Sequence, residues 1–121
     1  MSDRLTIDLP WPHRGLHPNA RLHWAAKAKH TKKARSDAAW LAKAAGAGKL
    51  VAVALDVTAT FLPPDARRRD TDGMFSSIKA YLDGLADATG IDDSNFNLSI
   101  RRGDIVRNGL VRLEIDPVTA P

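Results

Sequence analysis

Residues 50–62 restrict the fold more than any other segment. β-Branched and other apolar residues alternate there with smaller or polar ones, and the Pro63-Pro64 pair stops the run. This alternation predicts a strand with one buried face. Shorter alternating runs at 5–9, 96–100 and 111–115 predict three more strands, so the core is expected to form against a sheet.

Two segments between these strands predict helices. Residues 21–45 are rich in Ala, Lys and Leu without Pro or Gly, with Asn19 as a candidate N-cap and glycines at the far end. Residues 72–88 form the second helix, which Gly90 ends. Its apolar side carries Met74, Ile78, Tyr81, Leu82 and Leu85, and its polar side carries Asp72, Ser76, Lys79, Asp83 and Asp87.

The predicted order is therefore β-α-β-α-β-β. Asn108-Gly109 supplies the two residues with positive φ that a type I′ hairpin between the last two strands requires. With 121 residues, the chain is long enough for one domain and too short for two. We predict a single α+β domain over residues 1–121, with two helices and a mixed, partly antiparallel sheet.

The charges are distributed unevenly. The net charge is +4, and no acidic residue occurs between Asp8 and Asp37. One interpretation is a solvated surface, but a long basic run without compensating acids favours a phosphate-binding surface. The residues predicted to contact DNA are Arg21, Lys27, Lys29, Lys32, Lys33 and Arg35, together with the cluster Arg67, Arg68 and Arg69.

Several classes of protein are disfavoured. The chain has no cysteine, which excludes disulfides and thiolate metal sites and fits a reducing compartment. It begins without the apolar run of a signal peptide and has no apolar stretch long enough to cross a membrane, so we expect a cytoplasmic protein. The histidines have no acidic partner nearby, which disfavours zinc. Trp11, Trp24 and Trp40 could stack on bases, but Trp24 and Trp40 belong to an amphipathic helix, where a tryptophan is more often a core residue.

Asp70 and Asp72 stand directly after the arginine cluster, at a predicted helix start. In one interpretation Asp72 is an N-cap and Asp70 its salt-bridged neighbour. In the other, carboxylates within a phosphate-binding surface hold a divalent cation such as Mg²⁺, since otherwise they would repel the ligand. A further pair, Asp92-Asp93, follows in a loop and could equally be a solvated turn.

Residues 68–93 resemble the signature of the RusA family of Holliday junction resolvases. The matching parts are the arginine-rich approach to Asp70 and Asp72, the K-x-x-x-D step from Lys79, and the turn Gly90-Ile91-Asp92-Asp93. Pro12, Pro18-Asn19-Ala20-Arg21 and His23-Trp24 also resemble the opening of that family.

The resemblance implies a homodimer that nicks four-way DNA junctions symmetrically with Mg²⁺, for which Mn²⁺ is a plausible substitute. It also implies that Asp70, Asp72 and Asp93 hold the metal, with Asp92 the alternative to Asp93, and that Lys79 assists at the scissile phosphate. The chain departs from the family pattern at Gly73, where an asparagine is usual, and in a three-residue longer step from Asp72 to Lys79.

A continuous helix over residues 72–88 would be about 25 Å long, which would keep Asp93 away from Asp72. Either the helix is shorter and the chain folds back, or a twofold axis brings Asp93 of one subunit to the other subunit's site. The competing functions are a non-catalytic nucleic-acid-binding module and a metal-dependent nuclease that acts on flaps.

Overall fold

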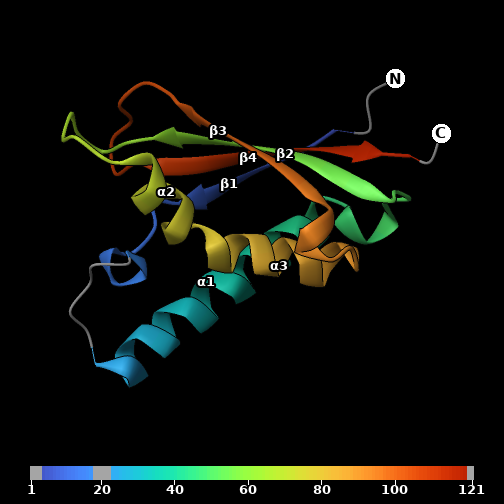
Figure 1. Cartoon of the computed structure of the whole chain (residues 1–121), viewed down its shortest axis with the longest axis horizontal. Coiled ribbons are helices and arrows are strands. Elements are labelled where there is room, and N and C mark those ends of the chain that lie inside the picture. Colours follow the sequence, from blue (N-terminus) through green and yellow to red (C-terminus); the bar gives the residue numbers. More distant parts are fainter. Residues whose placement is uncertain (1–3, 18–22, 120–121) are drawn as a thin grey trace.

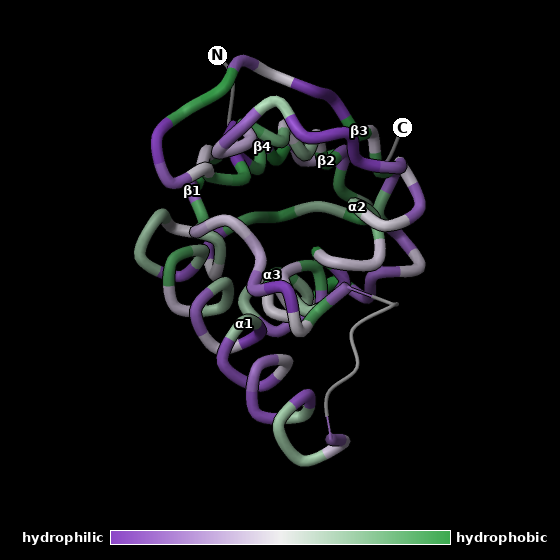
Figure 2. Tube along the Cα trace, turned by 90° about the vertical axis from the view of Figure 1, so that its left-hand side faces the viewer, coloured by the Kyte–Doolittle hydropathy of each residue, from purple (hydrophilic) through white to green (hydrophobic). Residues whose placement is uncertain are grey.

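The computed structural model describes residues 4–17 and 23–119. Within them the chain forms one α+β domain of two layers, with a mixed four-stranded sheet above three α-helices (Figure 1). The hydrophobic segments lie mainly in the strands, whereas the helix that is farthest from the sheet is largely hydrophilic (Figure 2). No helix in these residues is both long and apolar enough to cross a membrane.

All four predicted strands are present. They are β1 (Leu5–Pro10), β2 (Ala54–Leu62), β3 (Phe96–Arg102) and β4 (Leu110–Val118). The strand predicted at 50–62 is thus confirmed from residue 54 onwards, and residues 50–53 precede it. Its inward residues Leu55, Val57, Ala59 and Phe61 are all buried, because the alternation places every second side chain against the helices.

The predicted hairpin between the last two strands is wrong. The sheet order is β1-β4-β2-β3: β3 pairs in parallel with β2, and β4 lies antiparallel between β1 and β2. Asn108 and Gly109 do have positive φ angles, of 68° and 67°. However, the preceding loop crosses the end of β2, where Gly103 N–H donates to the Phe61 carbonyl, and so delivers β4 to the other side of β2.

Helix α1 (Trp24–Ala44) confirms the first predicted helix; residues 18–22, which include Asn19 and Arg21, lie outside the described residues. The His23 imidazole caps the helix by accepting the Ala25 N–H at 3.2 Å. Ala34, Ala38 and Ala42 face inward and are buried. Trp24 and Trp40 are 76% and 75% exposed, so their prediction as core residues is wrong.

The second predicted helix is broken in two, α2 (Thr71–Ser77) and α3 (Lys79–Thr89), with Ile78 between them. The Ser77 hydroxyl donates to the Met74 carbonyl at 2.7 Å, a back-bond that competes with the helix and favours a bend. The predicted apolar side is nevertheless buried throughout, and Gly90 ends α3 with a φ of 73°.

Candidate functional site

Asp65 organises the loop between β2 and the acidic pair. Its carboxylate accepts the Arg67 backbone N–H at 2.9 Å and a guanidinium N–H of Arg69 at 2.8 Å. These hydrogen bonds, the backbone one foremost, hold the pKa of Asp65 below its usual value. The Arg69 side chain is therefore committed to Asp65, whereas the side chains of Arg67 and Arg68 are exposed.

Asp70 and Asp72 follow this loop at the start of α2. Asp70 is the N-cap residue, but its side chain makes no capping hydrogen bond, so the interpretation of Asp72 as N-cap is wrong. Both residues are exposed, and neither carboxylate forms a hydrogen bond or ion pair with any residue that the structure describes. The neighbouring arginines thus do not neutralise this pair.

Arg102, at the end of β3, fixes the backbone of the acidic segment. Its guanidinium donates to the Arg69 carbonyl at 2.9 Å and to the Thr71 hydroxyl at 3.1 Å. The start of α2 is therefore attached to the carboxyl end of an edge strand. The sequence reasoning missed Arg102, although an arginine pair at the end of a predicted strand was a visible signal.

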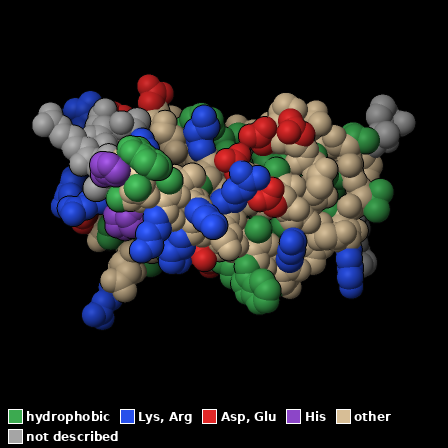
Figure 3. Space-filling view, turned by 90° about the horizontal axis from the view of Figure 1, so that it is seen from below, with side chains coloured by type: hydrophobic (Ala, Val, Ile, Leu, Met, Phe, Trp, Pro, Cys, Tyr) green, Lys and Arg blue, Asp and Glu red, His purple; other side chains and the backbone are tan. Residues whose placement is uncertain are grey.

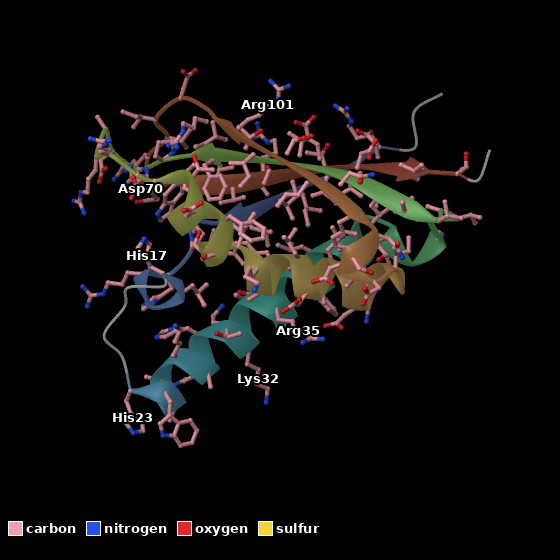
Figure 4. All side chains as sticks on the ribbon, viewed as in Figure 1. His17, His23, Lys32, Arg35, Asp70 and Arg101 are labelled. Carbon is pink, nitrogen blue, oxygen red and sulfur yellow. The ribbon has the colours of Figure 1, made fainter. Side chains whose placement is uncertain are left out.

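Asp70 lies in the wall of a basic cleft of about 810 Å³. Its polar lining comes mainly from two segments far apart in sequence, the 3₁₀ helix η1 (Arg14–Leu16) with its flanking histidines, and the arginine cluster. Figure 4 shows His17 and Asp70 at this same end of the molecule. Apart from Asp70, the charged or titratable residues that line the cleft are His13, Arg14, His17, Arg67, Arg68 and Arg69.

Trp11 forms the apolar part of this cleft. Its ring meets Phe61 edge-on at 5.8 Å, and the Arg69 guanidinium lies 5.0 Å above it. This cation–π contact, together with Asp65, keeps Arg69 in place. Trp11 is therefore a wall of the cleft that orients an arginine.

His17 explains the glycine at position 73. A Cβ built on Gly73 would lie 2.7 Å from His17 Nε2, so the imidazole occupies the space that a side chain there would need. The usual asparagine of the resembled family could enter only if His17 moved. This contact could not be predicted from sequence patterns, because the two residues are far apart along the chain.

His13 connects the cleft to α1. Its ring stacks on His30 at 3.7 Å, and its Nδ1 accepts the Gly15 N–H at 2.9 Å. Partial burial, followed by the nearby His30 and Arg14, lowers the pKa of His13. The His13 ring is therefore harder to protonate than a free imidazole.

Asp93 lies elsewhere, in a second hollow of about 430 Å³ beyond the end of α3. Asp92 caps the short helix η3 (Asp93–Asn95) by accepting the N–H and hydroxyl of Ser94, and these bonds lower its pKa. Asp93 has no such partner among the described residues. Of the pair, Asp93 is thus the residue available to a ligand.

The proposed metal ligands are consequently not all brought together within one chain. Asp70 and Asp72 precede α3 and Asp93 follows it, and α3 alone is about 16 Å long. The described residues contain no cluster of three or more Asp, Glu, His or Cys that could hold a metal ion. Lys79 is the exposed first residue of α3, directly after the break.

The basic residues of α1 divide into two groups. Lys33 pairs with Asp37 at 2.7 Å, and Arg35 pairs with Asp87 of α3 at 2.6 Å. Lys27, Lys29 and Lys32 form no ion pair with a described residue, and Figure 4 shows Lys32 pointing away from the domain. Arg21, the remaining predicted DNA contact in this region, lies outside the described residues.

No protein-family model matches the chain. A protein of Xylella fastidiosa (strain Temecula1 / ATCC 700964), described as an uncharacterized protein, is 44% identical over 94 residues. The match includes 75% of this chain and 61% of that protein, so the chain spans less than two thirds of its relative's length.

Proposed function

We propose that the protein is a structure-selective endodeoxyribonuclease that nicks four-way and related branched DNA with Mg²⁺, in recombination and repair. The observation that carries the proposal is the uncompensated pair Asp70 and Asp72 beside a cleft lined by arginines and histidines. The cleft attracts phosphate, whereas two bare carboxylates repel it unless a dication lies between them. Cysteine-free composition fits action in the cytoplasm.

In this proposal Asp70, Asp72 and Asp93 would hold Mg²⁺, with Mn²⁺ as a substitute. When bound, the ion supplies an activated water and neutralises charge on the reacting phosphate. Arg68 and Arg14 bind the flanking phosphates, and Arg69, fixed by Asp65 and Trp11, lines the same path. Lys79 stabilises negative charge at the scissile phosphate.

We further propose that the site is shared across a homodimer. β3 is an edge strand, and Phe96, Leu98 and Ile100 on its inner face are only half-buried. The amino end of β3 adjoins η3, and Arg102 attaches its carboxyl end to the start of α2. Antiparallel pairing of β3 with the same strand of a second copy would therefore bring Asp93 of one subunit towards Asp70 and Asp72 of the other.

The function is tested with a synthetic four-way junction, incubated with Mg²⁺ or with EDTA. We expect paired nicks on opposed strands with Mg²⁺ only. Asp70→Asn and Asp72→Asn should each abolish nicking and retain junction binding. The matched control Asp104→Asn, a change at an exposed loop aspartate, should retain both nicking and binding. Binding without any nicking by the wild type would support the alternative of a non-catalytic binding module.

Mixed dimers test the sharing. Asp72→Asn and Asp93→Asn chains are each inactive alone, but together they should restore about a quarter of the wild-type sites, because half the dimers then contain one intact site. No recovery on mixing would refute the shared site. Since the chain has no native cysteine, Ser99→Cys at the middle of β3 should also give a disulfide-linked dimer, and Thr6→Cys on the opposite edge should not.

A further inference from the structure

Trp24 and Trp40 are the largest exposed apolar side chains on α1, at 76% and 75% exposure. An indole normally contributes a large area to the core or to an interface, so two solvated ones on one helix indicate a surface that a partner covers. Neither residue belongs to the cleft described above.

The surroundings of Trp40 are basic. At 3.6 residues per turn, Trp40 shares the outward face of α1 with Lys29, Lys33 and Lys43, opposite the buried alanines. Asp37 is the only acid in the helix, and it is already paired with Lys33. Figure 3 shows this side of the molecule, where Lys and Arg side chains lie among protruding hydrophobic ones.

Trp24 lies at the amino end of the helix. This end projects from the domain, and Figure 4 shows His23 at its tip. The imidazole of His23 lies 5.5 Å from the Trp24 ring, so the tip presents two neighbouring aromatic rings. The contacts that hold α1 to the domain, His30 with His13 and Arg35 with Asp87, begin about two turns farther along.

We propose that α1 binds unpaired nucleotides, with Trp24 and Trp40 stacked on bases and the lysines on phosphates. Aromatic rings beside cations are the combination that binds single strands, because every exposed base offers a flat face. In a continuous duplex those faces are stacked on each other and closed to an indole. A second copy of the chain is a poorer occupant, since it would bring two lysine-rich helices together.

The inference rests on the proposed function in one respect, that DNA is the substrate, and it narrows the substrate class. The branch that the enzyme acts on contains unpaired nucleotides, as in a flap, a gap or an opened junction centre. The two indoles are about 24 Å apart along the helix and about 160° apart around it, so a strand that contacts both must pass around α1.

The test is equilibrium binding of the full-length chain in EDTA, measured by fluorescence anisotropy. The probes are a linear duplex, a fully paired four-way junction, and the same junction with unpaired thymidines at the branch. Trp24→Ala and Trp40→Ala should each weaken binding to the unpaired junction by about 5- to 100-fold and change duplex binding by less than about twofold. Trp40→Phe should retain most of the affinity.

Val51→Ala is the matched control, since Val51 is 85% exposed and lies outside α1. Equal losses on duplex and unpaired junction, or no loss at all, would overturn the inference. So would a dimer that dissociates in Trp40→Ala, which would identify a protein interface instead. The binding assay contains no Mg²⁺, so its outcome does not depend on nicking. If the tryptophans contribute to binding here but the protein does not nick junctions when Mg²⁺ is added, the proposed nuclease activity is refuted and this inference stands.

Discussion

Gly84→Ala tests the closest helix contact in the fold. Gly84 of α3 faces α1 so closely that an added Cβ would collide with the Arg35 carbonyl oxygen and lie 2.8 Å from the Ala38 Cβ and 2.9 Å from the Ala39 nitrogen. Two of these three atoms are backbone, so the helices must separate. Overpacking of this kind costs about 1–3 kcal/mol, against about 1 kcal/mol gained in helix propensity.

Because three atoms lie within 3.0 Å of the added Cβ, the cost belongs at the upper end of that range, about 2–3 kcal/mol. The expected net loss is then about 1–2 kcal/mol in the free energy of unfolding, or roughly 3–10 °C in Tm for a domain of this size. Urea and thermal unfolding followed by circular dichroism measure both quantities. Gly48→Ala is the control, because a Cβ there would meet only the Ala88 carbonyl oxygen, at 3.9 Å. If both variants unfold alike, α1 and α3 do not approach as described, and the reasoning is refuted.

Three further substitutions test how individual side chains contribute to the stability of the fold. Burial, with a smaller effect of a nearby aspartate, raises the pKa of Tyr81 to about 12. Wild-type stability should therefore fall as the pH rises from about 10 to 12, whereas Tyr81→Phe should lack that fall and lose about 1 kcal/mol at pH 7 with its hydrogen bond. The hydrogen bond from Arg35 lowers the pKa of Asp87, so Arg35→Gln should destabilise the protein at pH 7 and progressively less as the pH falls below about 4, measured by urea midpoints. Gly73→Ala should displace the exposed His17 ring with less than about 1 kcal/mol lost in urea unfolding, because a side-chain end moves more easily than backbone.

Sequence patterns predicted where the strands lie, but not which strands pair with each other in the sheet. Each strand needs one apolar face, and this requirement appears within the strand's own sequence as an alternation of apolar and polar residues. Pairing depends instead on where the loop after β3 runs. The positive φ angles of Asn108 and Gly109 suit a hairpin equally well, but the hydrogen bond from Gly103 to Phe61 carries the chain across β2.

The tryptophans show the limit of helical patterning. Ala34, Ala38 and Ala42 form the inward stripe of α1, and small residues suffice there because Gly84 lets α3 approach closely. A helix packed through alanines leaves no room for an indole on that face. Residue size alone therefore gave the wrong prediction, and only the partner helix determines which side chains are excluded.

The break at Ile78 could not be predicted from the hydrophobic periodicity either. Met74, Ile78, Tyr81, Leu82 and Leu85 keep one helical period across it, and all five are buried, so periodicity indicates a single helix. The Ser77 back-bond and the 3₁₀-type bond from Ile78 N–H to the Phe75 carbonyl at 3.2 Å redirect the backbone locally. The bend lies between Asp72 and Lys79, so the position of Lys79 relative to the acidic pair depends on the bend as well as on helical phase.

The way the other aspartates are paired strengthens the case for the acidic site. Most described aspartates have a partner in the fold: Asp8 binds Arg112, Asp37 Lys33, Asp56 Asn97, Asp65 Arg69, Asp87 Arg35, Asp92 Ser94, and Asp116 Arg4. Arg69 adjoins Asp70 in sequence, yet its guanidinium binds Asp65 and leaves Asp70 and Asp72 bare. Several arginines lie close to Asp70 and Asp72. The two carboxylates are therefore unpaired because of how those arginines are oriented, and not because cations are missing nearby. Because Arg69 binds Asp65, Asp70 and Asp72 remain exposed and unpaired beside a cleft that attracts phosphate, and this arrangement favours the joint binding of a dication and DNA.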